Sequence, residues 1–224
     1  MREIVLDTET TGLDPKTQRL VEIACVELEN HLPTGRHFHK QINPEMEVPA
    51  EAVAVHGLSS AKLKDAPLFG EIVAEFLDFI GESKLVIHNA DFDMGFINAE
   101  LGRLGFPKIP NARALDTVQM ARRKFPGAPA SLDALCKRFG IDNAHRTLHG
   151  ALLDAELLAQ VYLELVGGRQ VGLELAGAPT AASKATAPAQ AAAVRPARAH
   201  APSEAELADH KAAIGKLKNP LWLN

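Results

Sequence analysis

Hydrophobic and polar positions along the first 45 residues predict three strands joined by short links. Residues 3–8 form a short apolar run that stops at Thr10-Thr11-Gly12, as a buried strand does. Residues 20–29 alternate between apolar and polar positions and predict a second strand. The turn residues Pro33-Thr34-Gly35 then lead into a more polar third strand over residues 36–42. Strands linked this closely imply an antiparallel meander.

The pattern becomes helical after Pro49. Apolar residues recur with the i, i+3, i+4, i+7 spacing between Phe69 and Ile80, and Gly81 ends this helix. Strands that alternate with helices after an initial meander predict an α/β domain with a mixed five-stranded sheet flanked by helices. We place this domain over residues 1–168. The other expected elements are strands over 84–88 and 114–117 and helices over 92–104, 118–124, 131–139 and 151–166.

The composition changes abruptly after this domain. Residues 176–202 contain 13 Ala and 4 Pro and no acidic residue, so they bury too little apolar surface to offset chain entropy. We expect a flexible linker there. Residues 203–224 open on a capping-box pattern at Ser203 and Glu206 and contain the chain's only tryptophan, which predicts a segment that docks on a partner. Its apolar anchors are Leu207, Ile214, Leu217, Leu221 and Trp222.

Charge and composition exclude some classes of protein. No apolar run reaches the roughly 18 residues of a membrane span, and the N-terminus lacks a signal-peptide pattern, so we expect a cytoplasmic protein without a membrane segment. A net charge of −4 argues against a large basic surface that coats nucleic acid, although carboxylates that hold metal ions also subtract from the charge. Cys25 and Cys136 lie among apolar neighbours and are expected to be buried free thiols.

The first candidate site is Asp7-Thr8-Glu9. Residues two apart on a strand point to the same face, so Asp7 and Glu9 project together while Thr8 points away. Two carboxylates on a buried strand repel each other and resist ionisation unless a cation neutralises them. Their hard oxygen atoms suit Mg²⁺ or Mn²⁺. An acidic strand end at the surface is the simpler alternative.

A second acidic group follows the strand over residues 84–88, in the stretch Asn89-Ala90-Asp91-Phe92-Asp93. The carboxyl end of a strand and the amino end of the next helix are where open α/β sheets place their ligands. Either Asp91 or Asp93 can instead be an ordinary helix N-cap. The local pattern does not choose between the two.

The third candidate is His149 with Asp154. Gly150 lets a helix begin after it, which leaves His149 on a loop and Asp154 one turn inside the helix. The unperturbed pKa of histidine is about 6.5, so a histidine placed beside an acidic metal site can take a proton from water near neutral pH. A surface histidine followed by a capping aspartate is the alternative.

Together the three groups resemble the motifs of the DEDDh 3′→5′ exonuclease family, part of the ribonuclease-H-like superfamily. The resemblance spans roughly residues 3–167 and implies that Asp93, not Asp91, belongs to the site. The histidine subtype fits because the only tyrosine, Tyr162, follows the last aspartate. The matching residues are Asp7 and Glu9 for D-x-E, Asn89, Phe92 and Asp93 for N-x-x-F-D, and His149 and Asp154 for H-x-x-x-x-D.

The chain is similar above all to one branch of that family, the epsilon proofreading subunits of bacterial DNA polymerase III, in residues 4–12, 131–136 and 146–154. The resemblance implies an enzyme that removes mispaired 3′-terminal nucleotides from DNA by two-metal hydrolysis. Two divalent ions, Mg²⁺ or Mn²⁺, would be held by Asp7, Glu9, Asp93 and Asp154, with His149 as general base. The residues expected to bind substrate are Asp7, Glu9, Thr10, Glu51, His56, Asn89 and Asp154.

The resemblance also implies partners. Residues 169–175 contain a hexapeptide similar to the Q-x-x-L-x-[LF] motif that docks in a sliding clamp, with Gln170, Leu173 and Leu175 as its anchors. The other expected partners are the catalytic alpha subunit of a replicative DNA polymerase, bound by residues 203–224, and DNA with a single-stranded or frayed 3′ end.

Two rival interpretations differ from the proofreading one. An RNA-trimming enzyme similar to oligoribonuclease or ribonuclease T would use the same chemistry, but such an enzyme needs neither the linker nor the docking segment. A non-catalytic adaptor between polymerase and clamp would have lost an acidic ligand, whereas all four acidic positions and the histidine are present.

Overall fold

The computed structural model describes residues 1–146, 148–167 and 202–216. The chain divides into two units, Met1–Ala176 and Gly177–Asn224. The first unit contains the sheet and the candidate site, and the second contains one described helix, α8 (Glu204–Ile214).

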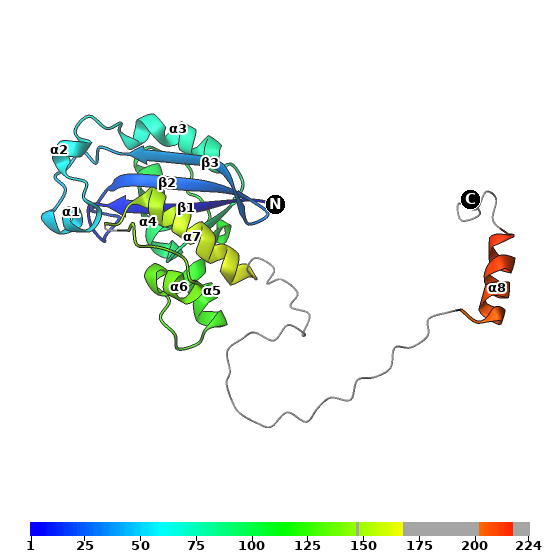
Figure 1. Cartoon of the computed structure of the whole chain (residues 1–224). Coiled ribbons are helices and arrows are strands. Elements are labelled where there is room, and N and C mark those ends of the chain that lie inside the picture. The colour runs from blue at the N-terminus through cyan, green and yellow to red at the C-terminus, as the bar shows by residue number, and fades with distance from the viewer. Residues whose placement is uncertain (147, 168–201, 217–224) are drawn as a thin grey trace, which may run out of the picture. The chain divides into compact units, whose positions relative to one another are not determined.

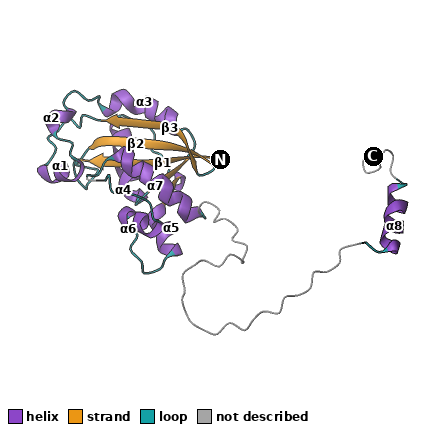
Figure 2. Ribbon diagram, viewed as in Figure 1, coloured by secondary structure: helices purple, strands orange, loops and turns teal. Residues whose placement is uncertain are grey.

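A mixed five-stranded sheet forms the centre of the first unit, with strand order β3-β2-β1-β4-β5. Figure 2 shows β3, β2 and β1 side by side. The first three strands pair antiparallel as a meander, and β4 and β5 extend the sheet in parallel with β1. The predicted fold class and the predicted pairing are therefore confirmed. The strands are β1 (Arg2–Thr10), β2 (Leu20–Glu29), β3 (Leu32–Gln41), β4 (Lys84–Ile87) and β5 (Ala114–Asp116).

The predicted turn between β2 and β3 is wrong by several residues. The chain reverses at Asn30 and His31, whose φ angles of 51° and 67° are those of a two-residue hairpin turn. Residues 33–35 lie inside β3 instead, next to an irregularity in the pairing between Val26 and Leu28. Pro33 is tolerated there because β3 is an edge strand.

Helices connect and cover these strands. The long helices agree with the predicted ones to within about two residues, whereas α1, α2 and the 3₁₀ turn η1 are too short to have been predicted from periodicity. The helices of the first unit are α1 (Ala50–His56), α2 (Ser60–Leu63), α3 (Phe69–Ile80), α4 (Ala90–Arg103), η1 (Asn111–Arg113), α5 (Thr117–Lys124), α6 (Leu132–Phe139) and α7 (Ala151–Val166).

Helices cover both faces of the sheet (Figure 1), and each face has its own hydrophobic core. Ile4 and Leu6 of β1 pack with α3 and α4, and Val5 packs with α5, α6 and α7. Side chains alternate along a strand, so Asp7 and Glu9 continue the α7 side, whereas Thr8 continues the α4 side. Acidic groups from both faces can therefore meet only at the end of β1.

The two cysteines lie in these cores, one in each. Cys25 and Cys136 are both buried and free, as the sequence predicted. Burial raises the pKa of each thiol above its ordinary value, which keeps the sulfur protonated. Neither cysteine is a candidate for metal binding or catalysis.

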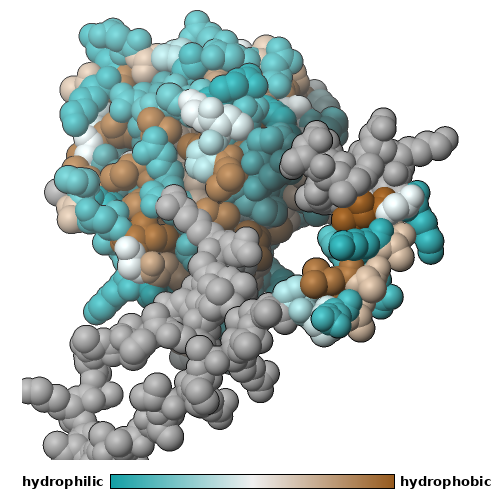
Figure 3. All heavy atoms as spheres, turned by 45° about the vertical axis from the view of Figure 1, so that its right-hand side comes forward, coloured by the Kyte–Doolittle hydropathy of each residue, from teal (hydrophilic) through white to brown (hydrophobic). Residues whose placement is uncertain are grey.

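Helix α8 begins at the predicted capping box. The Ser203 hydroxyl accepts from the Glu206 backbone N–H, and the Glu206 carboxylate accepts from the Ser203 N–H at 2.8 Å. Leu207 is 45% exposed and Ile214 is 9% exposed, and Figure 3 shows hydrophobic side chains on this helix between hydrophilic ones. The other predicted docking anchors lie outside the described residues, namely Gln170, Leu173, Leu175, Leu217, Leu221 and Trp222, as does the predicted linker up to residue 201.

Among the described residues, no helix has both the length and the apolar character needed to cross a membrane.

Candidate active site

A cavity of about 770 Å³ lies at the carboxyl end of β1. Five of the residues predicted to form the site line it together, although they come from four different parts of the chain. Asp7 and Glu9 come from β1, Asp93 from α4, Asp154 from α7 and His149 from the loop before α7. The motifs that are far apart in the sequence are therefore neighbours in the fold.

The strand pair Asp7 and Glu9 is electrostatically strained in the absence of a cation. Glu9 is 8% exposed. Burial, followed by the charges of Asp154 and Glu22, raises its pKa to about 8. The pKa of Asp7 is also raised well above its ordinary value, by burial first and then by Asp93 and Glu9. A positive charge placed between these groups would stabilise their ionised forms.

Asp93 reaches the same place from the opposite face of the sheet. It lies in the first turn of α4 and is 3% exposed. The Thr8 hydroxyl donates to its Oδ1 at 2.7 Å, and burial raises its pKa to about 7 despite this bond. Thr8 does alternate away from Asp7 and Glu9, yet it contributes to the site by holding the aspartate on the other side.

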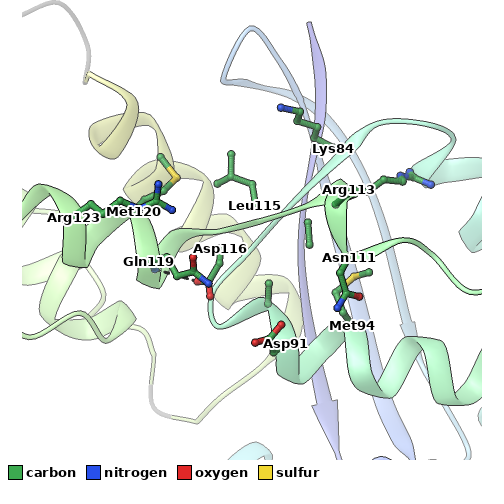
Figure 4. Close-up of a pocket in the computed structure, with 13 residues that line it drawn as sticks. Lys84, Asp91, Met94, Asn111, Arg113, Leu115, Asp116, Gln119, Met120 and Arg123 are labelled. Atoms are coloured by element: carbon green, nitrogen blue, oxygen red, sulfur yellow. Dashed lines mark hydrogen bonds between the residues drawn. The ribbon is translucent and has the colours of Figure 1, made fainter.

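The competing residue, Asp91, lies elsewhere. It is exposed and lines a separate hollow of about 400 Å³ beside the edge strand β5, together with Arg113 and Arg123 (Figure 4). Asp91 and Asp93 are two residues apart on α4, and each residue turns the helix by about 100°, so the two carboxylates point about 200° apart around its axis. Only Asp93 faces the other acidic groups.

His149 and Asp154 are positioned by the start of α7. Helix α7 begins after Gly150, and the His149 backbone N–H donates to Val55 O at 3.0 Å, which fixes the loop against α1. The His149 side chain is 50% exposed, whereas that of Asp154 is 4% exposed. Glu9, His149 and Asp154 each offer a ligand atom, and these atoms lie within 4.8 Å of one another.

This donor set fits a divalent metal ion. Burial raises the pKa values of Asp7, Glu9 and Asp93, and neighbouring carboxylates raise those of Asp7 and Glu9 further, so a cation is needed to ionise these groups at neutral pH. Hard carboxylate oxygens suit a hard divalent cation. Asp7, Glu9, Asp93 and Asp154 supply such oxygens on one cavity wall.

The predicted substrate contacts are divided between two hollows. Thr10, Glu51 and His56 line the main cavity. His56 is 6% exposed, and within the described part of the chain its Nε2 is buried without a hydrogen-bond partner. Asn89 is exposed and lines the adjoining hollow with His88 and Ser131 instead, so the structure does not bring it into the main cavity.

Two residues with contacts to the site were not singled out from the sequence. Arg146 is the first residue of the segment 146–154 that resembles the epsilon subunits, and its guanidinium contacts Asp154 and His149 inside the cavity. Glu22 of β2 lies opposite Glu9, and its Oε2 accepts from the Ala151 N–H at the start of α7, at 2.8 Å. The position of Arg146 close to His149 and Asp154 in the sequence could have identified it as a site residue, whereas no local pattern marks Glu22.

Fold and site together define a class. The family model described as Exonuclease, of the RNase T type, matches residues 4–162, and the chain therefore belongs to this exonuclease family. Two solved structures agree with that placement. Exonuclease X in complex with 5′-overhanging duplex DNA is 25% identical with a TM-score of 0.58, covering 73% of this chain and 90% of that one. The nuclease domain of 3′hExo, a DEDDh family member bound to rAMP, has the same fold at 18% identity and a TM-score of 0.64, covering 74% of this chain and 91% of that one.

More similar relatives narrow the class to one branch. DNA polymerase III subunit epsilon of Rickettsia conorii is 54% identical over 179 residues, which cover 78% of each chain. The subunit of the same name from Rickettsia typhi is 47% identical over 222 residues, covering 97% of each chain. The Escherichia coli subunit is 47% identical over 176 residues, covering 75% of this chain and 72% of that one. Within the exonuclease family, the chain thus belongs with the DNA polymerase III epsilon subunits.

Proposed function

We propose that this chain is the 3′→5′ exonuclease that removes mispaired 3′-terminal nucleotides from DNA as the proofreading subunit of a replicative DNA polymerase. The observation that carries the proposal is the convergence of four acidic side chains and His149 on one cavity in a chain that is 54% identical to an epsilon subunit. A non-catalytic adaptor has no need to keep four carboxylates together in one cavity, where burial raises the pKa values of Asp7, Glu9 and Asp93.

Asp7, Glu9, Asp93 and Asp154 would hold two divalent ions, Mg²⁺ or Mn²⁺. When bound, such a pair supplies Lewis acidity to the scissile phosphate and lowers the pKa of the attacking water. Asp7 is central in the proposal because its carboxylate feels the charges of the other three acidic residues. His149, half-exposed on its loop, would take the proton from the water.

The remaining cavity residues would bind the terminal nucleotide. Glu51 and His56 are contributed by α1, which lies against the His149 loop through the Val55 carbonyl. Because His56 Nδ1 accepts from the Leu58 N–H, its Nε2 carries the proton and would act as a donor towards the nucleotide. A frayed end enters such a cavity at lower cost than a paired one because it is already unstacked.

Partners are proposed from the relatives, whose names describe polymerase subunits. We propose that residues 203–224, beginning with α8, bind the polymerase catalytic subunit, and that residues 169–175 bind the sliding clamp. A subunit of the replication machinery would work beside the bacterial chromosome, in the cytoplasm.

An exonuclease assay tests the proposed activity. The full chain is incubated with 5′-labelled DNA primers that carry a matched or a mispaired 3′ end, with Mg²⁺, with Mn²⁺ or with EDTA. We expect stepwise loss of 3′ nucleotides as 5′-monophosphates, faster at the mispaired end and absent in EDTA. A sequence-matched RNA oligonucleotide is the comparison, and faster digestion of RNA than of DNA would favour the RNA-trimming rival.

Co-purification tests the docking segment. The chain is co-expressed with the catalytic subunit of a bacterial replicative polymerase, once in full and once truncated after residue 202. We expect the full chain to co-purify and the truncated chain to lose most of the partner while keeping its exonuclease activity. Equal recovery of the partner with both chains would refute the role of the tail.

A further inference from the structure

We propose that Arg146 is a resident cation that occupies the acidic site until the metal ions bind, and that it then moves onto Asp133. The inference rests on the proposed metal site and adds a positioning role for two residues that the proposal does not use. The Arg146 guanidinium contacts three side chains at once, those of Asp154, His149 and Asp133.

The first contact is with Asp154. Arg146 Nε donates to Oδ1 at 2.5 Å and Nη2 donates to Oδ2 at 2.7 Å, a two-pronged pair in which both carboxylate oxygens are engaged. The Arg146 side chain is 9% exposed and that of Asp154 is 4% exposed, so water screens the pair poorly. Among the described residues that line the cavity, Arg146 is the only lysine or arginine. The guanidinium therefore uses the oxygens that a metal ion needs.

The second contact is with His149. Arg146 Nη2 lies 2.9 Å from His149 Nδ1. A guanidinium has no acceptor, so in this contact it donates and the Nδ1 lone pair accepts. A neutral imidazole has one free lone pair, so the histidine in this state has none left to accept a proton from water. One side chain thus blocks both an acidic ligand and the proposed base.

The third contact provides a place for the displaced guanidinium. Arg146 Nη1 already donates to both Asp133 carboxylate oxygens, at 3.1 Å and 3.0 Å. Asp133 lies in the first turn of α6 and also lines the cavity, but its side chain is 59% exposed, whereas that of Asp154 is 4% exposed. A small rotation of the arginine would keep this partner while freeing Asp154 and His149. Metal binding and release of the base would then be one event.

The proposal predicts opposite effects of two substitutions on metal affinity. Arg146→Gln removes the competing cation, and we expect Mn²⁺ to bind about tenfold more tightly. Asp133→Asn removes the alternative partner, which leaves the guanidinium on Asp154, and we expect Mn²⁺ to bind about tenfold more weakly. Asp133→Asn added to Arg146→Gln should then have little further effect, because the arginine through which Asp133 acts is gone.

The experiment is Mn²⁺ titration of the metal-stripped full chain, followed by calorimetry and by the electron paramagnetic resonance signal of free Mn²⁺, without DNA. Lys137→Gln, an exposed position on the same helix as Asp133, is the control for the loss of one positive charge. Far-ultraviolet circular dichroism and urea denaturation of each variant show that it is folded.

The outcomes separate this inference from the proposed function. Tighter binding by Arg146→Gln, together with weaker binding by Asp133→Asn and non-additivity in the double variant, supports the resident cation. Unchanged or weaker binding by a folded Arg146→Gln overturns it, because the arginine would then not compete with the metal. If the unmodified chain binds no Mn²⁺, the proposed metal site itself fails.

Discussion

The buried carboxyl of Glu9 provides a test of the site that needs no substrate. An acidic group that is kept in a cavity against its own tendency to ionise should make the protein less stable when the cation is absent. We therefore expect Glu9→Gln to stabilise the metal-free protein at pH 8, although it removes a carboxylate proposed to hold metal. Gain of stability on removing a functional group is the opposite of what a structural carboxylate would show.

The pKa values set the size and the sign of the effect. The carboxyl has an ordinary pKa of 4.5 in the unfolded chain and a pKa of about 8 in the folded one, raised first by burial. The folded state binds the proton more tightly, so its stability is complete below pH 4.5 and is lost as the pH rises towards 8. At about 1.4 kcal/mol per pKa unit, the loss is at most about 5 kcal/mol. Attraction by Arg146 and water entering the cavity reduce it, and we expect about 1–4 kcal/mol.

The assay is urea denaturation of the metal-stripped chain and its variant at pH 5 and pH 8. The stability advantage of Glu9→Gln should be small at pH 5 and large at pH 8. Added Mn²⁺ at about 5 mM, which saturates sites of roughly millimolar affinity or tighter, should remove this advantage by stabilising the unmodified chain. Glu156→Gln, at an exposed position on α7, is the matched control. Lower stability of Glu9→Gln at pH 8, or an equal advantage at both pH values, would show that ionisation of the buried Glu9 carboxyl does not destabilise the metal-free protein.

Three further substitutions give separate tests. His149→Ala should lower kcat about 100-fold or more on a mispaired primer while retaining DNA binding; a nearly unchanged kcat removes the base assignment. Thr8→Val deletes the hydrogen bond to Asp93 and should cost about 1 kcal/mol in urea denaturation, with weaker Mn²⁺ binding in titration; unchanged binding would show that Asp93 needs no such support. Tyr162→Phe removes the hydroxyl that donates to buried Glu3 at 2.7 Å, far along β1 from the site. It should lower the free energy of unfolding by about 1–3 kcal/mol and leave kcat unchanged; a fall in kcat would show that this hydrogen bond does affect the site.

Much of the fold was predictable because the core is periodic. The α3 helix from Phe69 to Ile80 buries five side chains along one face. Successive residues of β2 enter the two cores in turn, with Ile23 and Cys25 on one face of the sheet and Ala24 and Val26 on the other. The hairpin turn was misplaced because Pro33 and Gly35 are common turn residues, whereas the reversal occurs at Asn30 and His31. Local composition did not reveal that the edge position of β3 makes a proline acceptable.

The site was predictable to a different degree. Asp7 and Glu9 could be paired from strand periodicity alone, but Asp93 could be preferred to Asp91 only through the family resemblance until the structure placed them on different surfaces. Contacts between side chains far apart in sequence, such as Thr8 with Asp93 and Arg146 with Asp154, depend on how helices from both faces meet at the end of β1. No pattern along the chain contains that information.

Anomalous diffraction from crystals of the full chain grown with Mn²⁺ would locate the metal ions directly. We expect two manganese peaks about 3.5–4 Å apart among Asp7, Glu9, Asp93 and Asp154, with an Asp7 oxygen shared between them. Absence of manganese from this cavity, at a concentration that supports exonuclease activity, would contradict the proposed metal site.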